Sequence, residues 1–352
     1  MARFIFSTHA KVVSSIATFL GFIPPISSYH QLKYVRKVID QLKGFLSHEN
    51  QASLVICEIM CNYNVSLEDV EDPGAHISLT NTFDGTLDTV KQTYLAQWTP
   101  KLDVQLQIAK LNLYATSALL PLQNSSLADA QNLINRQTLF LRGLESATTL
   151  INHMKDMGLL PNLKGQSPAG KIPFLPKHFF SSLFFSAVFL FRIFVFLQPL
   201  NHDHTARAIQ GMLDAQSTFQ LLPHHRDLAR AARLIGKLIE KAQTAGVAGS
   251  HWPLAELIIT NRLGASILWD TFAQMRVTAN LERSNSEGEA TQVMRLIGPD
   301  PLPLAPEMKL RLQNAGVTLT RTTPTKEQGL DSWTSWDVDL DNFEFDLDQQ
   351  ML

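Results

Sequence analysis

The chain has 352 residues and a formal net charge of −2, and 45% of its residues are hydrophobic while only 18% are charged. This much apolar surface excludes a chain that is disordered throughout, and the near-neutral charge predicts no general attraction to nucleic acid. Its two cysteines, Cys57 and Cys61, are too few for a disulfide-built secreted scaffold or a metal cluster that needs four thiolates. On a helix their i, i+4 spacing places both on one face, where we expect two small buried side chains.

Most of the chain has the composition and apolar spacing of α-helix. We predict helices over residues 30–47, 51–63, 86–98, 102–120, 126–157, 174–198, 204–221, 225–245 and 252–281. Residues 102–108 alternate apolar and polar side chains as a half-buried strand does, but the alternation ends by Leu111, so we assign helix there as well. The tripeptide Asp72-Pro73-Gly74 is interpreted as a turn. The sequence therefore predicts an all-α fold, with one large helical domain over residues 1–283.

The most apolar segment is residues 179–197, which contains eight phenylalanines and a single charged residue, Arg192. A helix of that length reaches about 28 Å, close to the thickness of a bilayer core. Arg192 lies well inside the segment, where a charge costs about 2.5–3.5 kcal/mol in lipid. We favour a buried core helix, and an integral membrane protein anchored by this segment is the alternative.

The motifs that would indicate catalysis or cofactor binding are incomplete. Residues 165–172 nearly match a phosphate-binding loop, but Ile172 replaces the hydroxyl residue that would hold magnesium, and Pro173 follows where a helix N-terminus is needed. His202 and His204 are two residues apart and so face different sides of a helix, which is poor spacing for a metal. The adjacent pair His224-His225 is likewise interpreted as solvated loop residues. We therefore predict a protein that is not an enzyme and has no cofactor in this chain.

One side of the helix predicted over residues 225–245 is basic. Five residues recur there at spacings of four, three, four and four, opposite an apolar side: Arg226, Arg230, Arg233, Lys237 and Lys241. We interpret this basic stripe as a solvated helix face. Contact with phosphate groups and docking of the chain's own acidic tail are the functional alternatives, and both need direct contact because salt screens charges beyond about 8 Å.

The C-terminal part of the chain differs in composition from the rest. Residues 284–330 are rich in Pro, Thr and Gly and are predicted to be a disordered linker. Residues 331–352 contain seven acidic residues, no basic residue and four aromatic residues. Because like charges resist collapse, the aromatic side chains stay available to a partner. We predict an acidic activation tail whose anchors for a coactivator groove are Trp333, Trp336, Phe343, Phe345 and Leu347.

Several segments resemble a known family. They are Phe83-x-x-x-Leu87 followed by Trp98, residues 109–114 (Ala-Lys-Leu-x-Leu-Tyr), the phenylalanine-rich residues 179–192, and residues 230–238 (Arg-Ala-Ala-Arg-Leu-Ile-x-x-Leu). Their order and spacing resemble the regulatory "middle homology" region of fungal binuclear zinc-cluster transcription factors. The nearest branch is the regulators of the leucine-biosynthesis and weak-acid-response type. The resemblance spans about residues 8–281.

This resemblance implies an all-helical regulatory domain, a nuclear location and control of transcription. It also implies that the middle region restrains a C-terminal activation segment until a metabolite or a partner intervenes, and that the phenylalanine-rich helix is core. The family's DNA-binding module needs six cysteines, and residues 1–56 contain none. We therefore expect zinc only in a missing N-terminal module, and a truncated or partner-dependent regulator without autonomous DNA binding. The expected partners are a transcriptional coactivator or another transcription factor, with a small metabolite as effector and no membrane.

Overall fold

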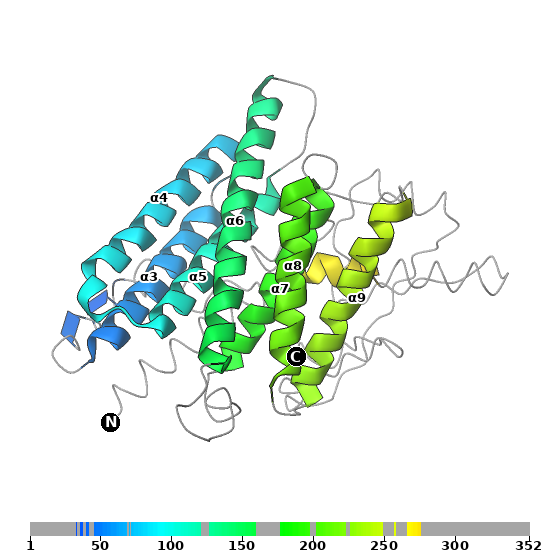
Figure 1. Ribbon diagram of the computed structural model, residues 1–352. Coiled ribbons are helices and arrows are strands. Elements are labelled where there is room, and N and C mark those ends of the chain that lie inside the picture. The colour runs from blue at the N-terminus through cyan, green and yellow to red at the C-terminus, as the bar shows by residue number, and fades with distance from the viewer. Residues whose placement is uncertain are drawn as a thin grey trace, which may run out of the picture. The chain divides into compact units, whose positions relative to one another are not determined.

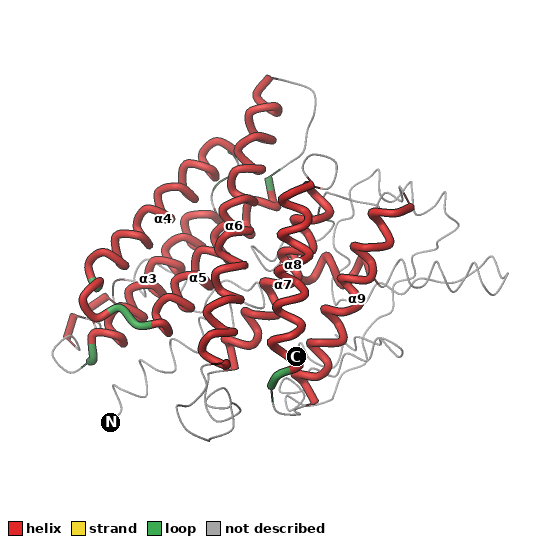
Figure 2. The backbone as a smooth tube through the Cα atoms, in the orientation of Figure 1, coloured by secondary structure: helices red, strands yellow, loops and turns green. Residues whose placement is uncertain are grey.

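The computed structural model of the chain describes residues 33, 36, 37, 40, 41, 46–68, 70, 72–120, 127–159, 177–197, 202–222, 226–248, 257 and 266–275. These residues form helices and short connections, and none of them forms a strand (Figure 2). The predicted all-α fold is therefore confirmed. The predicted linker and acidic tail, residues 284–330 and 331–352, lie outside the described residues.

The chain divides into two compact units, Met1–Leu268 and Trp269–Leu352, and in the second unit the described residues 269–275 are helical. The labelled helices belong to the first unit and are α3 (His48–Glu68), α4 (Pro73–Thr93), η1 (Leu95–Gln97), α5 (Pro100–Ala115), η2 (Thr116–Leu119), α6 (Leu127–Leu159), α7 (Lys177–Leu197), α8 (His202–Gln220) and α9 (Arg226–Ala248). Helices α3, α4 and α5 pack together, as do α7, α8 and α9 (Figure 1). Helix α6 joins the two groups, because it contacts α5 as well as α7 and α8.

Helix α4 begins much earlier than the sequence analysis predicted. The expected turn at residues 72–74 is instead the start of the helix, and the expected start at residue 86 is wrong. Asp72 is the N-cap, where its Oδ2 accepts a hydrogen bond of 2.6 Å from the backbone N–H of Ala75, and Pro73 occupies the first turn. Asp followed by Pro favours a helix start as much as a turn, because the cap satisfies a free N–H and proline has none to satisfy.

Helix α5 explains the period-two alternation of residues 102–108. Leu102 and Leu106 are one turn apart on one side of the helix and Val104 lies on the opposite side, yet all three are buried. Helix α5 contacts α3, α4, α6 and α7, so apolar side chains are needed around most of its circumference. The prediction of helix here is confirmed, and the alternation reflects a helix surrounded by others.

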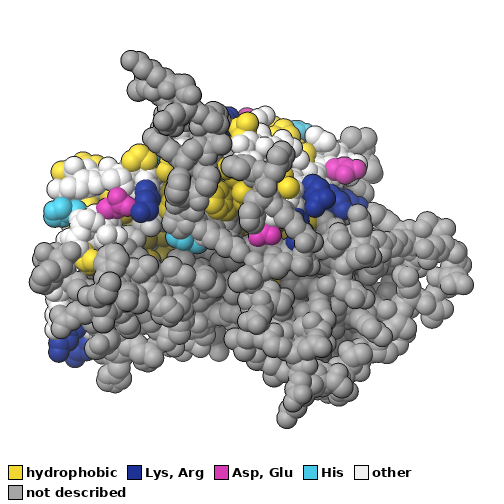
Figure 3. Space-filling view, turned by 90° about the horizontal axis from the view of Figure 1, so that it is seen from below, with side chains coloured by type: hydrophobic (Ala, Val, Ile, Leu, Met, Phe, Trp, Pro, Cys, Tyr) yellow, Lys and Arg dark blue, Asp and Glu magenta, His cyan; other side chains and the backbone are white. Residues whose placement is uncertain are grey.

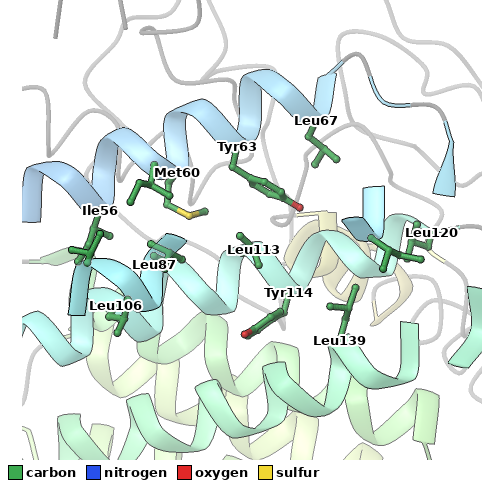
Figure 4. Close-up of a cluster of buried hydrophobic side chains, with 14 residues drawn as sticks. Ile56, Met60, Tyr63, Leu67, Leu87, Leu106, Leu113, Tyr114, Leu120 and Leu139 are labelled. Carbon is green, nitrogen blue, oxygen red and sulfur yellow. The ribbon is translucent and has the colours of Figure 1, made fainter. Parts of the chain in front are cut away.

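A cluster of buried side chains fills the space between α3, α4, α5 and α6. Figure 4 shows Met60 and Tyr63 of α3, Leu113 and Tyr114 of α5, and their neighbours in this cluster. The members are Ile56, Ile59, Met60, Tyr63, Leu67, Ile77, Leu87, Val90, Leu106, Ala109, Leu113, Tyr114, Leu120 and Leu139. Phe83 and Trp98, two of the residues that carry the family resemblance, are partly buried against it. This cluster is the core of the N-terminal helix group.

Helix α7 carries the phenylalanine-rich segment and is buried along nearly its whole length. Phe189 packs edge-on against Phe140 of α6, with ring centroids 5.9 Å apart. Helices α6 and α7 approach closely at Gly143, where an added Cβ would come within 2.5 Å of the Phe189 ring. His178–Phe196 is the one helical span among the described residues that is long and apolar enough to cross a membrane, and 83% of its most apolar window is buried inside the protein. This burial is what the core interpretation predicts.

Candidate functional site

The acidic tail, which carries the strongest functional prediction, is not among the residues that the structure describes. The five predicted coactivator anchors therefore stay predictions: Trp333, Trp336, Phe343, Phe345 and Leu347. Residues 165–172, which nearly match a phosphate-binding loop, and the pair His224-His225 also lie outside the described residues. Among the predicted features, the structure describes the cysteine pair on α3, the phenylalanine-rich segment of α7, His202 and His204 of α8, and the basic stripe of α9.

Only some residues of the predicted basic stripe lie at the surface of α9. Arg233 and Lys237 are exposed and Lys241 is half-buried, which agrees with a polar helix side. Arg230 does not belong to this surface, because its side chain is only 6% exposed. The side chain of Arg226 is not described. Helical spacing assigns a residue to one side of a helix but does not determine what packs on that side, and this is why the expectation for Arg230 is wrong.

Charged side chains of both signs lie on the face of the described residues that Figure 3 shows. On the face seen in Figure 3, the described Lys and Arg side chains are interspersed with Asp and Glu. Lys155 of α6 lies 3.9 Å from Asp214 of α8, an example of such pairing.

No group of three or more His, Cys, Asp or Glu residues among the described positions is arranged to hold a metal ion. Cys57 and Cys61 both lie on α3 and form no disulfide, Cys61 buried and Cys57 half-buried. His202 is exposed at the start of α8, whereas His204 is half-buried. Cys61 is buried as expected, but Cys57 is only partly so. The expectation of solvated loop histidines is wrong for His202 and His204, because both lie in helix α8 and His204 is half-buried.

A buried polar cluster joins α3, α4 and η2, and we call it the His76 junction (Tyr63, His76, Thr80 and Thr116). The Nε2 atom of His76 lies 3.1 Å from Oγ1 of Thr116, and the hydroxyl of Tyr63 contacts both Oγ1 of Thr116 and, at 3.1 Å, Oγ1 of Thr80. All four side chains are buried. Burial lowers the pKa of His76 from 6.5 to about 4, so the imidazole is neutral at pH 7. Burial raises the pKa of Tyr63 despite the two threonine hydroxyls, so its hydroxyl stays protonated.

A second cluster places a lysine between two carboxylates where α4 meets α5, and we call it the Asp84 junction. The Nζ atom of Lys110 lies 2.9 Å from Oδ1 of Asp84 and 2.8 Å from Oδ1 of Asp88, and Nη1 of Arg142 lies 3.5 Å from Oδ2 of Asp84. Burial alone would lower the pKa of Lys110, but the two carboxylates outweigh it and the pKa is raised. Burial, followed by the hydrogen bond to Asp84, raises the pKa of Tyr114. The side chains of Lys110 and Tyr114 therefore both stay protonated next to Asp84.

A third polar contact fixes the corner between α4 and α5. Oδ1 of Asp103 accepts hydrogen bonds of 2.8 Å from Nζ of Lys91 and from the indole Nε1 of Trp98. Nζ of Lys91 also lies 5.8 Å from the Trp98 ring centroid, within the range of a cation–π contact. Burial raises the pKa of Asp103, but the hydrogen bonds and charge of Lys91 and the bond from Trp98 lower it overall. Trp98, part of the family resemblance, therefore anchors the α4–α5 connection.

The buried guanidinium of Arg136 links three elements. Its Nη1 donates a hydrogen bond of 2.7 Å to the backbone carbonyl of Leu120, which follows η2. Its Cζ atom lies 5.4 Å from the ring centroid of Phe140 on α6 and 5.0 Å from that of Phe196 on α7. Arg136 thus joins α6 to the end of η2 and to α7 through one hydrogen bond and two ring contacts.

These clusters act as links between helices. In the clusters above, the hydroxyl of Thr116 is the one that contacts a histidine ring. This hydroxyl is fully buried and donates a hydrogen bond of 2.7 Å to the carbonyl of Leu113. That pair gives a substrate no access, although a hydroxyl next to an imidazole is the arrangement of an activated nucleophile. The sequence analysis missed both junctions because their partners are far apart in the chain: Tyr63 and Thr116 are separated by 53 residues and His76 and Thr116 by 40. The available signals were the i, i+4 pairs His76/Thr80 and Asp84/Asp88, which occur by chance in many helices.

Comparison with known proteins adds no family assignment. No family model matches the chain, and neither a curated protein nor a solved structure matches it significantly.

Proposed function

We propose that the chain is a transcription regulator that acts in the nucleus through its helical domain and its acidic C-terminal segment. The observation that carries this proposal is the composition of residues 331–352, in which seven acidic residues and no basic residue surround four aromatic side chains. An all-α domain with a buried phenylalanine-rich helix is also the fold that the resemblance to fungal zinc-cluster regulators implies. The helical domain is then the regulatory part, and the tail contacts the transcription machinery.

In this proposal the tail binds a groove of a coactivator through apolar anchors. Its acidic residues keep the tail soluble and bring it toward a basic partner, while Trp333, Trp336, Phe343, Phe345 and Leu347 supply the buried contact. The proposed route to target genes is contact with another transcription factor, a partner that the family resemblance implies. A small metabolite is the proposed effector of the helical domain.

The experiment is a reporter assay with residues 331–352 fused to an unrelated DNA-binding domain. We expect activation by the natural tail and its loss in the double variant Phe343→Ala and Phe345→Ala, because an aromatic anchor is often worth more than about 2 kcal/mol, or about 30-fold in affinity. The matched control is Ser332→Ala and Ser335→Ala, which changes two positions in the same tail without removing an anchor. Equal output from the two double variants contradicts the anchor assignment.

The alternative of an integral membrane protein is favoured by one observation, the length and hydropathy of His178–Phe196. The burial of that span inside the helical domain supports the soluble regulator instead. Alkaline carbonate extraction of cell membranes separates the two. We expect the protein in the supernatant, and a protein that stays in the membrane pellet contradicts the regulator.

A further inference from the structure

Helix α4 is held at its N-terminal end by the His76 junction. His76 is in the first turns of α4, and its ring contacts Thr116 of η2, which in turn contacts Tyr63 of α3. Thr80, one turn further along α4, contacts the same tyrosine hydroxyl. Three separate elements therefore meet at one buried set of polar atoms.

The two threonine hydroxyls of the junction also form hydrogen bonds to backbone carbonyls. Thr80 donates its hydroxyl hydrogen to the carbonyl of His76 at 2.9 Å, and Thr116 donates its own to the carbonyl of Leu113 at 2.7 Å. Each threonine hydroxyl has a single hydrogen and the Tyr63 hydroxyl has one more, so these few hydrogens are shared among the contacts between the elements. A neutral His76 ring carries one hydrogen, and its other ring nitrogen is the one that takes up a second proton.

A second proton on His76 meets no compensating charge at the junction. Tyr63, which faces the junction from α3, stays neutral because burial raises its pKa, and Thr116 of η2 does not ionise. The described carboxylate nearest in sequence is that of Asp72, the N-cap of α4, and it has no part in the shifted pKa of His76 although it keeps its charge while its Oδ2 accepts the N–H of Ala75. The lowered pKa of His76 has burial as its cause, with no contribution from a charged neighbour. Among the described residues an imidazolium there is therefore a buried charge with no charged partner, which is strongly unfavourable.

The position and composition of α4 also lower the free-energy cost of opening it locally. Helix α5 is enclosed by α3, α4, α6 and α7, whereas α4 lies at the edge of the helix array (Figure 1). Helix α4 contains five threonines and two glycines, Gly74 and Gly85, which are weak helix formers. Elements with few neighbours and low helix propensity open locally at lower cost than the core.

We propose that the His76 junction is an acid-sensitive latch, in which protonation of His76 releases the N-terminal part of α4 from α3 and η2 while α6 and α7 stay folded. The expected effect follows from the proton affinities of the open and closed states. With an ordinary pKa of 6.5 in the open state and about 4 in the closed state, lowering the pH from 7 to 5 increases the opening equilibrium constant about 20-fold.

Hydrogen exchange of the whole protein at pH 7 and pH 5 tests this latch. Rates are corrected for the intrinsic effect of pH with the same peptides in the unfolded chain. We expect an increase of about 20-fold in the opening of residues 73–83 and little change in α6 and α7. His76→Gln, which keeps an N–H donor and takes up no proton, is expected to abolish the increase. The control His202→Gln, at an exposed position of α8, is expected to keep it.

Two results overturn the latch. One is the same pH effect on residues 73–83 in His76→Gln as in the natural protein. The other is an equal increase in α6 and α7, which means that acid opens the fold as a whole. If His76→Gln does not fold, the comparison of α4 with α6 and α7 in the natural protein alone decides the question.

Discussion

Gly143→Ala is expected to destabilise the protein because α6 has no room for a side chain at this position. An added Cβ would lie within 2.5 Å of Cε1 of Phe189, closer still to its Cζ, and 3.3 Å from Cβ of Tyr114. Real Cβ atoms essentially never come within 3.0 Å of such neighbours, so the backbone or the Phe189 ring must move. The ring is fully buried and packs edge-on against Phe140, which leaves it little freedom to turn.

The magnitude follows from two opposing effects. Overpacking of a well-packed core costs about 1–3 kcal/mol, and the rigid ring at Gly143 places this substitution at the upper end. Replacing glycine by alanine inside a helix returns about 1 kcal/mol. We therefore expect a net loss of about 2 kcal/mol. Gly85→Ala is the matched control, because nothing lies within 4 Å of the Cβ that it adds to α4, and we expect a gain of up to about 1 kcal/mol there.

Urea unfolding followed by circular dichroism at 222 nm measures both variants against the natural protein. We expect the midpoints to move in opposite directions with an unchanged slope, since neither substitution alters the surface exposed on unfolding. Equal stability of the two variants, or a stabilised Gly143→Ala, refutes the close approach of α6 and α7 described above.

Two further predictions concern charged and titrating groups. Asp84→Asn is expected to lower the free energy of unfolding by about 1–3 kcal/mol, because the side chain of Lys110 is only 13% exposed and loses its buried partner. Asp88→Asn removes a carboxylate that is 57% exposed and is expected to cost less than about 1 kcal/mol. Urea unfolding of the two variants checks this order, and equal losses contradict it. Because the pKa of His76 is lower in the folded chain than its ordinary value, the unfolded chain binds a proton first, and the free energy of unfolding is expected to fall by about 3 kcal/mol in total between pH 6.5 and pH 4. The difference in unfolding free energy between the natural protein and His76→Gln across this range measures that effect, and parallel curves contradict it.

The helices themselves follow from the sequence wherever one apolar side is clear. The predicted apolar side of α9, opposite the basic stripe, is buried at Ile235, Leu238 and Ala242, and the segment around Phe189 is a buried helix. The predicted helix boundary was wrong where one residue pattern fits both a turn and a helix start. Asp72 and Pro73 begin α4 and do not form the predicted turn.

The buried polar links do not follow from the sequence. Tyr63 meets Thr116 across 53 residues, and Arg142 meets Asn81 across 61 residues, so neither contact leaves a local pattern. Arg230 shows the same limit for exposure, since its position on the polar side of α9 gave no sign of the burial that the fold imposes. Local spacing predicts the faces of a helix, and the chain's tertiary packing decides which of them meet.

Regulated activation is most directly measured by comparing two fusions to the same DNA-binding domain, one with residues 331–352 alone and one with the whole chain, at equal protein levels. We predict that the short fusion drives the reporter strongly and that the whole chain drives it less, because the proposed function has the helical domain restrain the acidic segment. A silent short fusion contradicts the account.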